Sequence, residues 1–188
     1  DEKGFVPDSD ATVITRLLDA GTTILGKTTA SDGVGIDDFE SNSPFVTVRN
    51  PRRPTHAPGG SSSGSAAALV SGDIELALGA DQGGSVRIPA AWSGVVGLRP
   101  SYGLVPYTGI IATEMTMVAV GPLANTVEDV ARALNVLAGP DSLDPRQRGI
   151  VAPDVDYLSS IGKGAANARI AVVRESFNQA PWKELGLP

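Results

Sequence analysis

Two glycine–serine turns contain the residues of this sequence that are best suited to chemistry. They lie in the stretch 59–89, GGSSSGSAAALVSGDIELALGADQGGSVRIP, and their key serines, Ser61 and Ser85, are 24 positions apart. A serine hydroxyl that is activated by a neighbouring base can attack a carbonyl carbon and form an acyl-enzyme. Glycines beside each serine allow sharp turns and close approach of amide hydrogens to a substrate. The stretch therefore predicts a serine-based catalytic centre.

Other glycine-rich motifs fit these turns less well. A phosphate-binding P-loop needs Lys and then Ser or Thr after its last glycine, whereas Gly64 is followed by Ser and Ala. The turn at Gly83 resembles the G-x-S-x-G nucleophile elbow, but Arg87 stands in place of the last glycine. A Ser-His-Asp hydrolase would have to use His56, the single histidine, as its base. A flexible Gly/Ser linker is the remaining structural interpretation of the first turn.

Composition narrows the class of protein. With 15 basic and 21 acidic residues the formal net charge is −6, which argues against a nucleic-acid or anionic-membrane surface. The sequence has no cysteine, which excludes disulfides and a cysteine nucleophile, and one histidine disfavours a histidine-based metal site. No apolar run approaches the ~18 residues of a transmembrane helix, and no signal-peptide pattern opens the sequence. The length of 188 residues predicts a single domain.

Four segments have the pattern of helices, with apolar stripes or small residues between capping and stop signals. The first is capped by Asp8-Ser9-Asp10. The last opens with a capping-box-like T-x-x-D at Thr126 and ends before Gly139-Pro140. Between them, two helices are predicted directly beside the serine turns, at 63–71 and 86–92.

Short apolar runs and one long irregular region complete the predicted organisation. The run LALGAD at 76–81 is apolar almost throughout, which is typical of a central strand in a sheet covered on both faces. Residues 28–58 are rich in Gly, Ser, Asp, Asn and Pro, which predicts a long surface excursion. The expected fold class is α/β, with helices packed on a mixed, mostly buried sheet. Further strands are predicted at 22–26, 95–98 and 169–173.

The two turns and their surroundings carry a specific resemblance. GGSSSGSAA, followed at a fixed distance by GADQGGSVRIPAAWSGVVGLRPSYG, resembles the core of the amidase signature family. The match extends to DATVITRLLDAGTTILGKT before it and GPLANTVEDVARALNVLAG after it, and so covers most of residues 5–175. The motifs DQGGS and LDPRQ most closely resemble those of bacterial amidases associated with nitrile metabolism. The resemblance implies the amidase signature fold, a small-molecule amide substrate, and no metal or organic cofactor.

The same resemblance implies roles for individual residues. In the family, the residue at the position of Ser85 is the nucleophile. The residue that matches Ser61 follows a cis peptide bond, after Gly60, and passes protons between the nucleophile and a lysine. Each backbone donor to the developing oxyanion can lower the barrier by about 3 kcal/mol. The donors implied by the resemblance are the N–H groups of Gln82, Gly83, Gly84 and Ser85.

Two charged residues bracket the second turn. Asp81 and Arg87 stand four and two positions from Ser85, on opposite sides. A carboxylate and a guanidinium at this spacing can form an ion pair that holds the loop between them. We therefore expect both residues to support the turn structurally rather than to take part directly in the chemistry.

Parts of the family pattern are not found in these 188 residues. The catalytic lysine of the family lies in a K-D-N segment, which neither Lys3 nor Lys27 matches, and the C-terminal portion of the family pattern is missing. A lysine base also needs its pKa lowered from ~10.4 to near 7, which requires about 4–5 kcal/mol of differential environment. We therefore expect a single amidase signature domain over 1–188 that is incomplete at both ends and inactive alone, with its base outside the chain.

Three functions agree with these observations. The leading hypothesis is an amide hydrolase that releases acid and ammonia through an acyl-enzyme on Ser85, with Ser61 as the proton relay. The second is the glutaminase (A-type) subunit of a tRNA-dependent amidotransferase, and the third is a catalytically inert scaffold or interaction protein. The leading hypothesis implies a cytoplasmic protein that contacts neither nucleic acid nor membrane directly. A homodimer is one arrangement considered for the complete protein.

Overall fold

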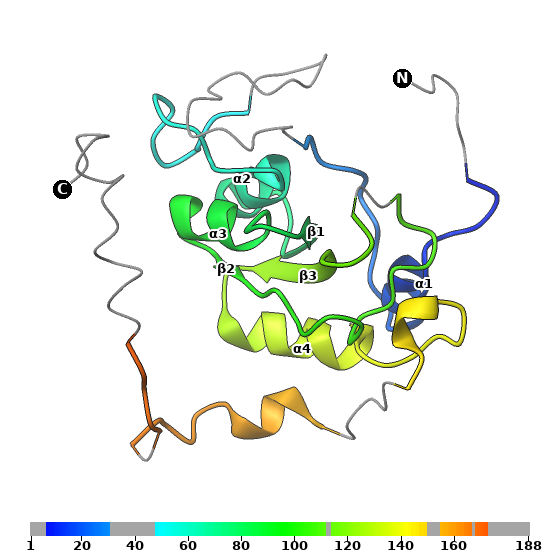
Figure 1. Cartoon of the computed structure of the whole chain (residues 1–188). Helices are drawn as coiled ribbons and strands as arrows, with labels where there is room; N and C mark the ends of the chain where they lie inside the picture. The colour runs from blue at the N-terminus through cyan, green and yellow to red at the C-terminus, as the bar shows by residue number, and fades with distance from the viewer. Residues whose placement is uncertain (1–6, 31–47, 112–113, 150–154, 167, 173–188) are drawn as a thin grey trace.

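A small sheet lies between helices in the computed structural model, which describes residues 7–30, 48–111, 114–149, 155–166 and 168–172. Figure 1 shows α2 and α3 on one side of the sheet and α4 on the other. The elements are α1 (Thr12–Asp19), α2 (Ser63–Ser71), β1 (Leu76–Asp81), α3 (Arg87–Ser93), β2 (Val96–Gly97), β3 (Ala119–Ala124), α4 (Val127–Leu137) and the 3-10 helices η1 (Pro145–Gln147) and η2 (Tyr157–Ser160).

Strand β3 is the central strand of the described sheet. The strand order is β1-β3-β2, with Asp81 opposite Ala119 and Gly97 opposite Leu123, and both pairings are antiparallel. All six residues of β3 are buried. Helices packed on a buried sheet confirm the predicted α/β class. The segment 76–81 is a strand as predicted, but its predicted central position is wrong, because β3 takes the centre and β1 lies at an edge of the described sheet.

Sequence patterns miss β3 because it contains two residues that normally interrupt strands. Pro122 has no N–H to donate, yet its carbonyl accepts the amide of Leu98 at 3.1 Å. Gly121 lies where the neighbouring strand end comes very close, and a Cβ at this position would collide with the carbonyl oxygen of Leu98. The glycine is therefore a requirement of tight strand packing, not a sign of a turn.

Replacement of Gly121 by alanine is expected to destabilise the fold by about 1–3 kcal/mol, because the added methyl must push the Leu98 carbonyl away from β3. Urea unfolding of the full-length protein measures the effect. The matched control is Gly83→Ala, since a Cβ at Gly83 meets no described atom within 4 Å. An unfolding midpoint for Gly121→Ala equal to that of the wild type would contradict the close strand approach.

The helices nearest the serine turns form as predicted. Helix α2 spans Ser63–Ser71 and ends at Gly72, whose φ of 80° is the left-handed conformation that favours glycine. Helix α3 and strand β2 lie within two residues of their predicted bounds. Helix α4 begins after Thr126, whose hydroxyl accepts the amide of Asp129, so the predicted cap is confirmed.

Two predicted strands are wrong. Residues 22–26 form no strand, and Leu25 is 72% exposed. Residues 169–172 likewise form no strand, and Val173 lies outside the described residues. An apolar run becomes a strand only where a neighbouring strand offers hydrogen bonds, and no strand in the described ranges pairs with either segment.

The start of α1 also differs from the prediction. The helix begins at Thr12 with Ala11 as its N-cap, so Asp8-Ser9-Asp10 does not cap it. Instead, the Thr12 amide donates to the carbonyl of Thr108 at 3.2 Å, and the Thr12 hydroxyl donates to Asp141 at 2.7 Å. Tertiary partners thus supply what the sequence pattern assigned to a local cap.

The predicted surface excursion is described only in part. Residues 31–47 of this excursion lie outside the described ranges. Its last part forms turns, with Asn50 and Arg53 paired in an isolated antiparallel bridge. The Asn50 side chain donates to the carbonyl of Trp92 at 2.9 Å, which attaches these turns to α3.

The sheet separates two apolar cores. One core joins α2 and α3 to the sheet, and its most buried members include Leu69 and Leu123. The other joins α1 and α4 to the opposite side through Val13, Leu17 and Leu137. Arg16 reinforces this second junction, because its guanidinium donates to the carbonyls of residues 137 and 139 at 2.6 and 2.9 Å, at and just beyond the end of α4.

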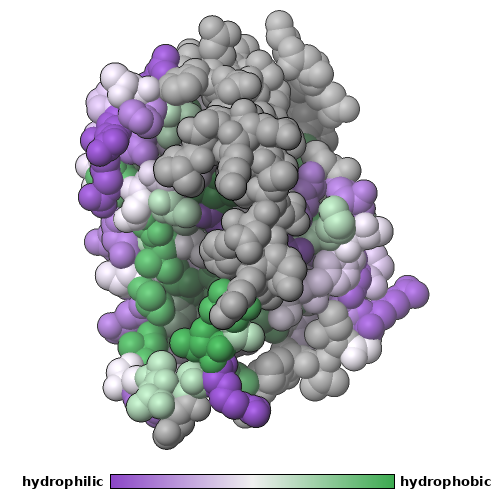
Figure 2. Space-filling model, turned by 60° about the vertical axis from the view of Figure 1, so that its left-hand side comes forward, coloured by the Kyte–Doolittle hydropathy of each residue, from purple (hydrophilic) through white to green (hydrophobic). Residues whose placement is uncertain are grey.

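Apolar side chains also gather on the surface. Figure 2 shows a strip of apolar residues on one face of the molecule. Exposed apolar area of this kind is typical of contact surfaces. The large apolar side chains that are at least 67% exposed are Leu25, Ile111, Leu143, Ile170 and Val172.

None of the helices in the described ranges has the length and apolar composition that crossing a membrane requires.

Candidate active site

The two glycine–serine turns lie side by side. The amide of Ser62 donates to the carbonyl of Ser85 at 3.2 Å. Close by, the Ser93 hydroxyl at the end of α3 donates to the carbonyl of Pro58 at 3.0 Å, and both groups are buried. The chain before α2 therefore rests on α3, and the fold joins the immediate surroundings of Ser61 to those of Ser85.

The first turn has an unusual backbone. The peptide bond between Gly60 and Ser61 is cis. Gly59 before it has a φ of 84°, and a Cβ there would collide with the backbone of Pro89, so both conformation and space require glycine. Ser61 is half-buried, and α2 begins two residues later.

The other serines of this turn are engaged in structural contacts. The Ser65 hydroxyl donates to the carbonyl of Leu78 at 3.1 Å and lies 2.9 Å from the Thr28 hydroxyl. The amide of Gly64 donates to the carbonyl of Thr29 at 2.9 Å. These contacts attach residues 28–29 to the first turn of α2 and α2 to β1, so the helix that follows Ser61 is held from two sides.

Asp81 organises the second turn from the end of β1. Its side chain is fully buried. Its Oδ1 accepts the amide of Gly84 at 2.8 Å, while its Oδ2 accepts the amides of Val86 and Arg87 at 3.1 and 3.3 Å. A charged carboxylate that accepts three amides of one turn fixes the path of the backbone around Ser85.

The guanidinium of Arg87 binds the same carboxylate in a bidentate pair, Nε to Oδ2 and Nη2 to Oδ1, both at 2.9 Å. Burial raises the pKa of Asp81, but the hydrogen bonds from Arg87 and from the amides of Gly84, Val86 and Arg87 outweigh it and lower the pKa to about 2. Asp81 is therefore ionised at neutral pH and acts as an anchor rather than as a proton donor.

One predicted oxyanion donor is engaged elsewhere. The amide of Gly84 donates to Asp81, which differs from the expectation that it would donate to an oxyanion. Gly83 next to it is exposed and has no left-handed φ, and a Cβ at this position would meet no described atom within 4 Å. Neither the backbone nor the packing of the described residues requires glycine at this position.

Among the described residues, neither His56 nor Lys27 forms a hydrogen bond with Ser61 or Ser85. His56 is exposed, and its ring nitrogen lies 2.9 Å from the hydroxyl of Thr55 within the turns that follow Asn50. Lys27 is exposed. Among the described residues no group of three or more His, Asp or Glu side chains could hold a metal ion.

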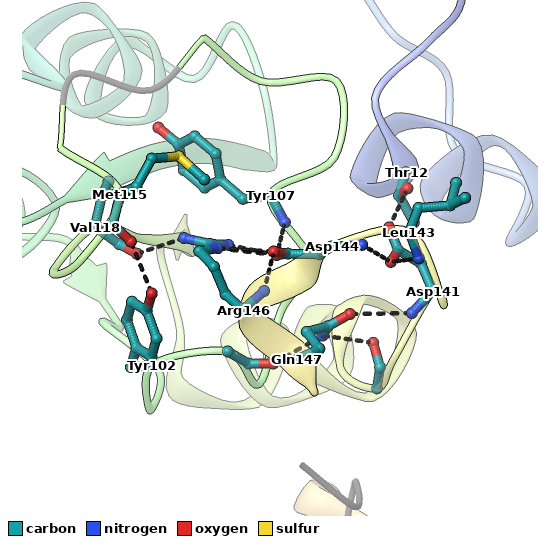
Figure 3. Close-up of polar contacts among 12 residues, drawn as sticks. Thr12, Tyr102, Tyr107, Met115, Val118, Asp141, Leu143, Asp144, Arg146 and Gln147 are labelled. Atoms are coloured by element: carbon teal, nitrogen blue, oxygen red, sulfur yellow. Dashed lines mark hydrogen bonds and ion pairs between the residues drawn. The ribbon is translucent and has the colours of Figure 1, made fainter. Parts of the chain in front are cut away.

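A second polar cluster, in the LDPRQ segment, lies at η1 (Figure 3). Arg146 and Asp144 form a buried ion pair of 2.7 Å, with side chains 5% and 2% exposed. Asp144 accepts the amide of Tyr107 at 2.8 Å, and Arg146 donates to the carbonyl of Val118 at 3.0 Å. Burial raises the pKa of Asp144, but the hydrogen bonds from the Arg146 side chain and from the amides of Tyr107 and Arg146 lower it overall. The cluster thereby holds the residue that leads into β3.

The described residues thus bring together two glycine–serine turns, one with a cis peptide bond and one held by a buried carboxylate. The chain belongs to the Amidase family, whose profile matches residues 2–185.

Individual relatives show what the chain is similar to within this family. It is 51% identical over 187 residues to the A subunit of the glutamyl-tRNA(Gln) amidotransferase of Natronomonas pharaonis, covering 94% of the chain and 44% of that relative. It is 46% identical to an enantioselective amidase of Rhodococcus rhodochrous, covering 94% and 34%. The crystal structure of the corresponding A subunit from Thermotoga maritima superposes with a TM-score of 0.78 at 39% identity, covering 87% and 35%. The chain therefore spans less than half the length of these relatives.

Proposed function

We propose that the full-length protein is an amide hydrolase whose nucleophile is Ser85, built on a single amidase signature domain. The observation that carries the proposal is the contact between the two turns, in which the amide of Ser62 donates to the carbonyl of Ser85. This contact supports a shared role for Ser61 and Ser85, because each serine lies within one residue of the hydrogen bond. Similarity to an enantioselective amidase gives independent support.

The proposed reaction proceeds through an acyl-enzyme. The Oγ of Ser85 attacks the amide carbonyl carbon and passes its proton to Ser61, which passes its own proton to a lysine outside these 188 residues. The carbon–nitrogen bond then breaks, the returning proton reaches the nitrogen, and ammonia leaves. Water attacks the acyl-enzyme with the same relay as base, which frees the acid and restores the Ser85 hydroxyl. The negative oxygen formed in both steps faces the amides of Gln82, Gly83 and Ser85.

A second candidate shares this chemistry but uses its ammonia differently. The chain is similar to the A subunits of several glutamyl-tRNA(Gln) amidotransferases, with identities up to 51%. On this alternative the substrate is glutamine, and ammonia passes to a partner protein that binds tRNA. The two candidates are separated by measuring ammonia released from glutamine with and without co-expressed partner proteins: release that depends on them favours the amidotransferase.

Covalent labelling tests the proposed nucleophile. We expect a fluorophosphonate to label the full-length protein at Ser85, as read by mass spectrometry of the peptide that carries it. Equal labelling of the Ser85→Ala variant would show that another residue is the nucleophile. Absence of labelling, together with absence of amide hydrolysis by the full-length protein, would favour an inert scaffold instead.

Gly83 provides a test in which function and stability separate. Because a Cβ at Gly83 meets no described atom, Gly83→Ala is expected to leave the unfolding temperature unchanged. We expect it to lower kcat/KM for amides by about tenfold or more, since the methyl enters the space where the substrate carbonyl must approach the amides. Steady-state ammonia release and thermal unfolding measure the two quantities. Unchanged kcat/KM would mean that the substrate carbonyl does not approach the turn at Gly83.

A further inference from the structure

Arg99 connects three segments at the end of the sheet that carries the second turn. It follows β2, and its side chain is 26% exposed. Its Nε donates to the main-chain carbonyl of Asp81 at 3.3 Å and lies 3.6 Å from the Asp81 carboxylate. Its Nη2 donates to the carbonyl of Met117 at 2.5 Å, just before β3. One guanidinium thus holds the last residue of β1 to the entrance of β3.

The carbonyl that Arg99 holds belongs to the same peptide unit as the Gln82 amide. A trans peptide is planar, and its C=O and N–H groups point in opposite directions. Fixing the direction of the Asp81 carbonyl therefore fixes the direction of the Gln82 N–H. A cation on the carbonyl oxygen also polarises the peptide, which strengthens the N–H as a hydrogen-bond donor.

Arg87 and Arg99 donate hydrogen bonds to different parts of Asp81, which supports a separate role for Arg99. The guanidinium of Arg87 binds the side-chain carboxylate of Asp81 through both of its oxygens. Arg99 donates to the main chain instead, and its other contact, the carbonyl of Met117, lies beside the Val118 carbonyl that Arg146 holds. The Met117 carbonyl that Arg99 contacts is therefore itself attached to a fixed part of the fold.

We infer that Arg99 is a positioning residue, which aims the Gln82 amide at the developing oxyanion; the inference rests on the proposed function. Arg99 does not touch the reacting atoms. It acts through the Asp81–Gln82 peptide, because it fixes the direction of the peptide dipole before the reaction begins. Lysine cannot replace it fully, because a single ammonium lacks the planar fork that spans both carbonyls.

The test compares a probe that forms an oxyanion with one that does not. The probes are the aldehyde and the primary alcohol that correspond to the amide the wild-type enzyme hydrolyses fastest; for benzamide they are benzaldehyde and benzyl alcohol. The aldehyde carbon bonds to the Ser85 oxygen, whose proton passes to Ser61 and on to the lysine, and the aldehyde carbonyl oxygen becomes the oxyanion. The alcohol only occupies the site. Inhibition constants are measured for full-length wild type, Arg99→Met, Arg99→Lys and the control Arg132→Met, whose side chain is exposed on α4.

We expect Arg99→Met to weaken the aldehyde about tenfold or more and to leave the alcohol unchanged, with Arg99→Lys in between and the control equal to wild type. Unchanged aldehyde binding, or an equal loss for aldehyde and alcohol, would overturn the role assigned to Arg99. Failure of the proposed function looks different: the full-length wild type would hydrolyse no amide, or Ser85→Ala would bind the aldehyde as tightly as wild type.

Discussion

Replacing Ser85 by alanine is expected to lower kcat/KM of the full-length protein for its best amide substrate by about 10⁴- to 10⁶-fold. The loss is large because the variant cannot form the acyl-enzyme, and the remaining rate comes only from binding and from the amides that stabilise the oxyanion. Ammonia release under steady-state conditions measures it. Substrate affinity should change little, because the removed hydroxyl acts in the chemical step rather than in ground-state binding.

Two further serine variants make this result specific. Ser61→Ala should also lower kcat strongly, and the double variant Ser61→Ala/Ser85→Ala should be no worse than Ser85→Ala alone, because residues that act as one unit are not additive. Ser71→Ala, at the exposed end of α2, is the matched control and should retain full activity. Retention of wild-type activity by Ser85→Ala would remove the basis of the proposed mechanism.

The substitution Asp81→Asn is expected to cost about 3–5 kcal/mol of unfolding free energy and to abolish amide hydrolysis at the same time. The asparagine side chain has no charge to pair with Arg87 and offers one oxygen where the carboxylate uses two to accept the amides of Gly84, Val86 and Arg87. Urea unfolding and ammonia release measure the two effects. Asp73→Asn, an exposed carboxylate in the loop before β1, is the matched control.

The pH dependence of stability gives an independent readout of Asp81. Its pKa in the folded protein is about 2, below its usual value of 3.8. A lowered pKa contributes stability that is fully present above 3.8 and is lost as the pH falls toward 2. The difference in unfolding free energy between wild type and Asp81→Asn should therefore shrink as the pH falls through this window. A difference that is constant between pH 5 and pH 2 would contradict the assigned ion pair.

Elements with local signals could be predicted from the sequence. Helix α4 was predictable because Thr126 caps it and an apolar stripe runs along it, and α2 because Gly72 ends it. Strand β3 could not be predicted, because Gly121 and Pro122 resemble a turn until the neighbouring strands are known. Conversely, the apolar run 22–26 resembles a strand but has no pairing partner among the described residues.

The same limit applies to the candidate site. The ion pair between Asp81 and Arg87 was predictable, since the two residues are close in sequence and bracket one turn. The hydrogen bond from the Gly84 amide to that carboxylate was not predictable, because residue types do not show which amide a carboxylate will face. Arg99 was missed for a related reason: it reaches Asp81 over 18 positions through the arrangement of strands, and no local pattern records such a contact.

The junction between Arg16 and the end of α4 has a consequence for synthesis. The hydrogen bond from Arg16 to Leu137 spans 121 positions. At a translation rate of about 5–20 residues per second, α1 leaves the ribosome roughly 6–24 s before its partner exists. During that interval Val13 and Leu17, which end 2% and 4% exposed, lack the residues that α4 contributes to their core. The apolar face of α1 therefore stays partly uncovered until the end of α4 has been synthesised.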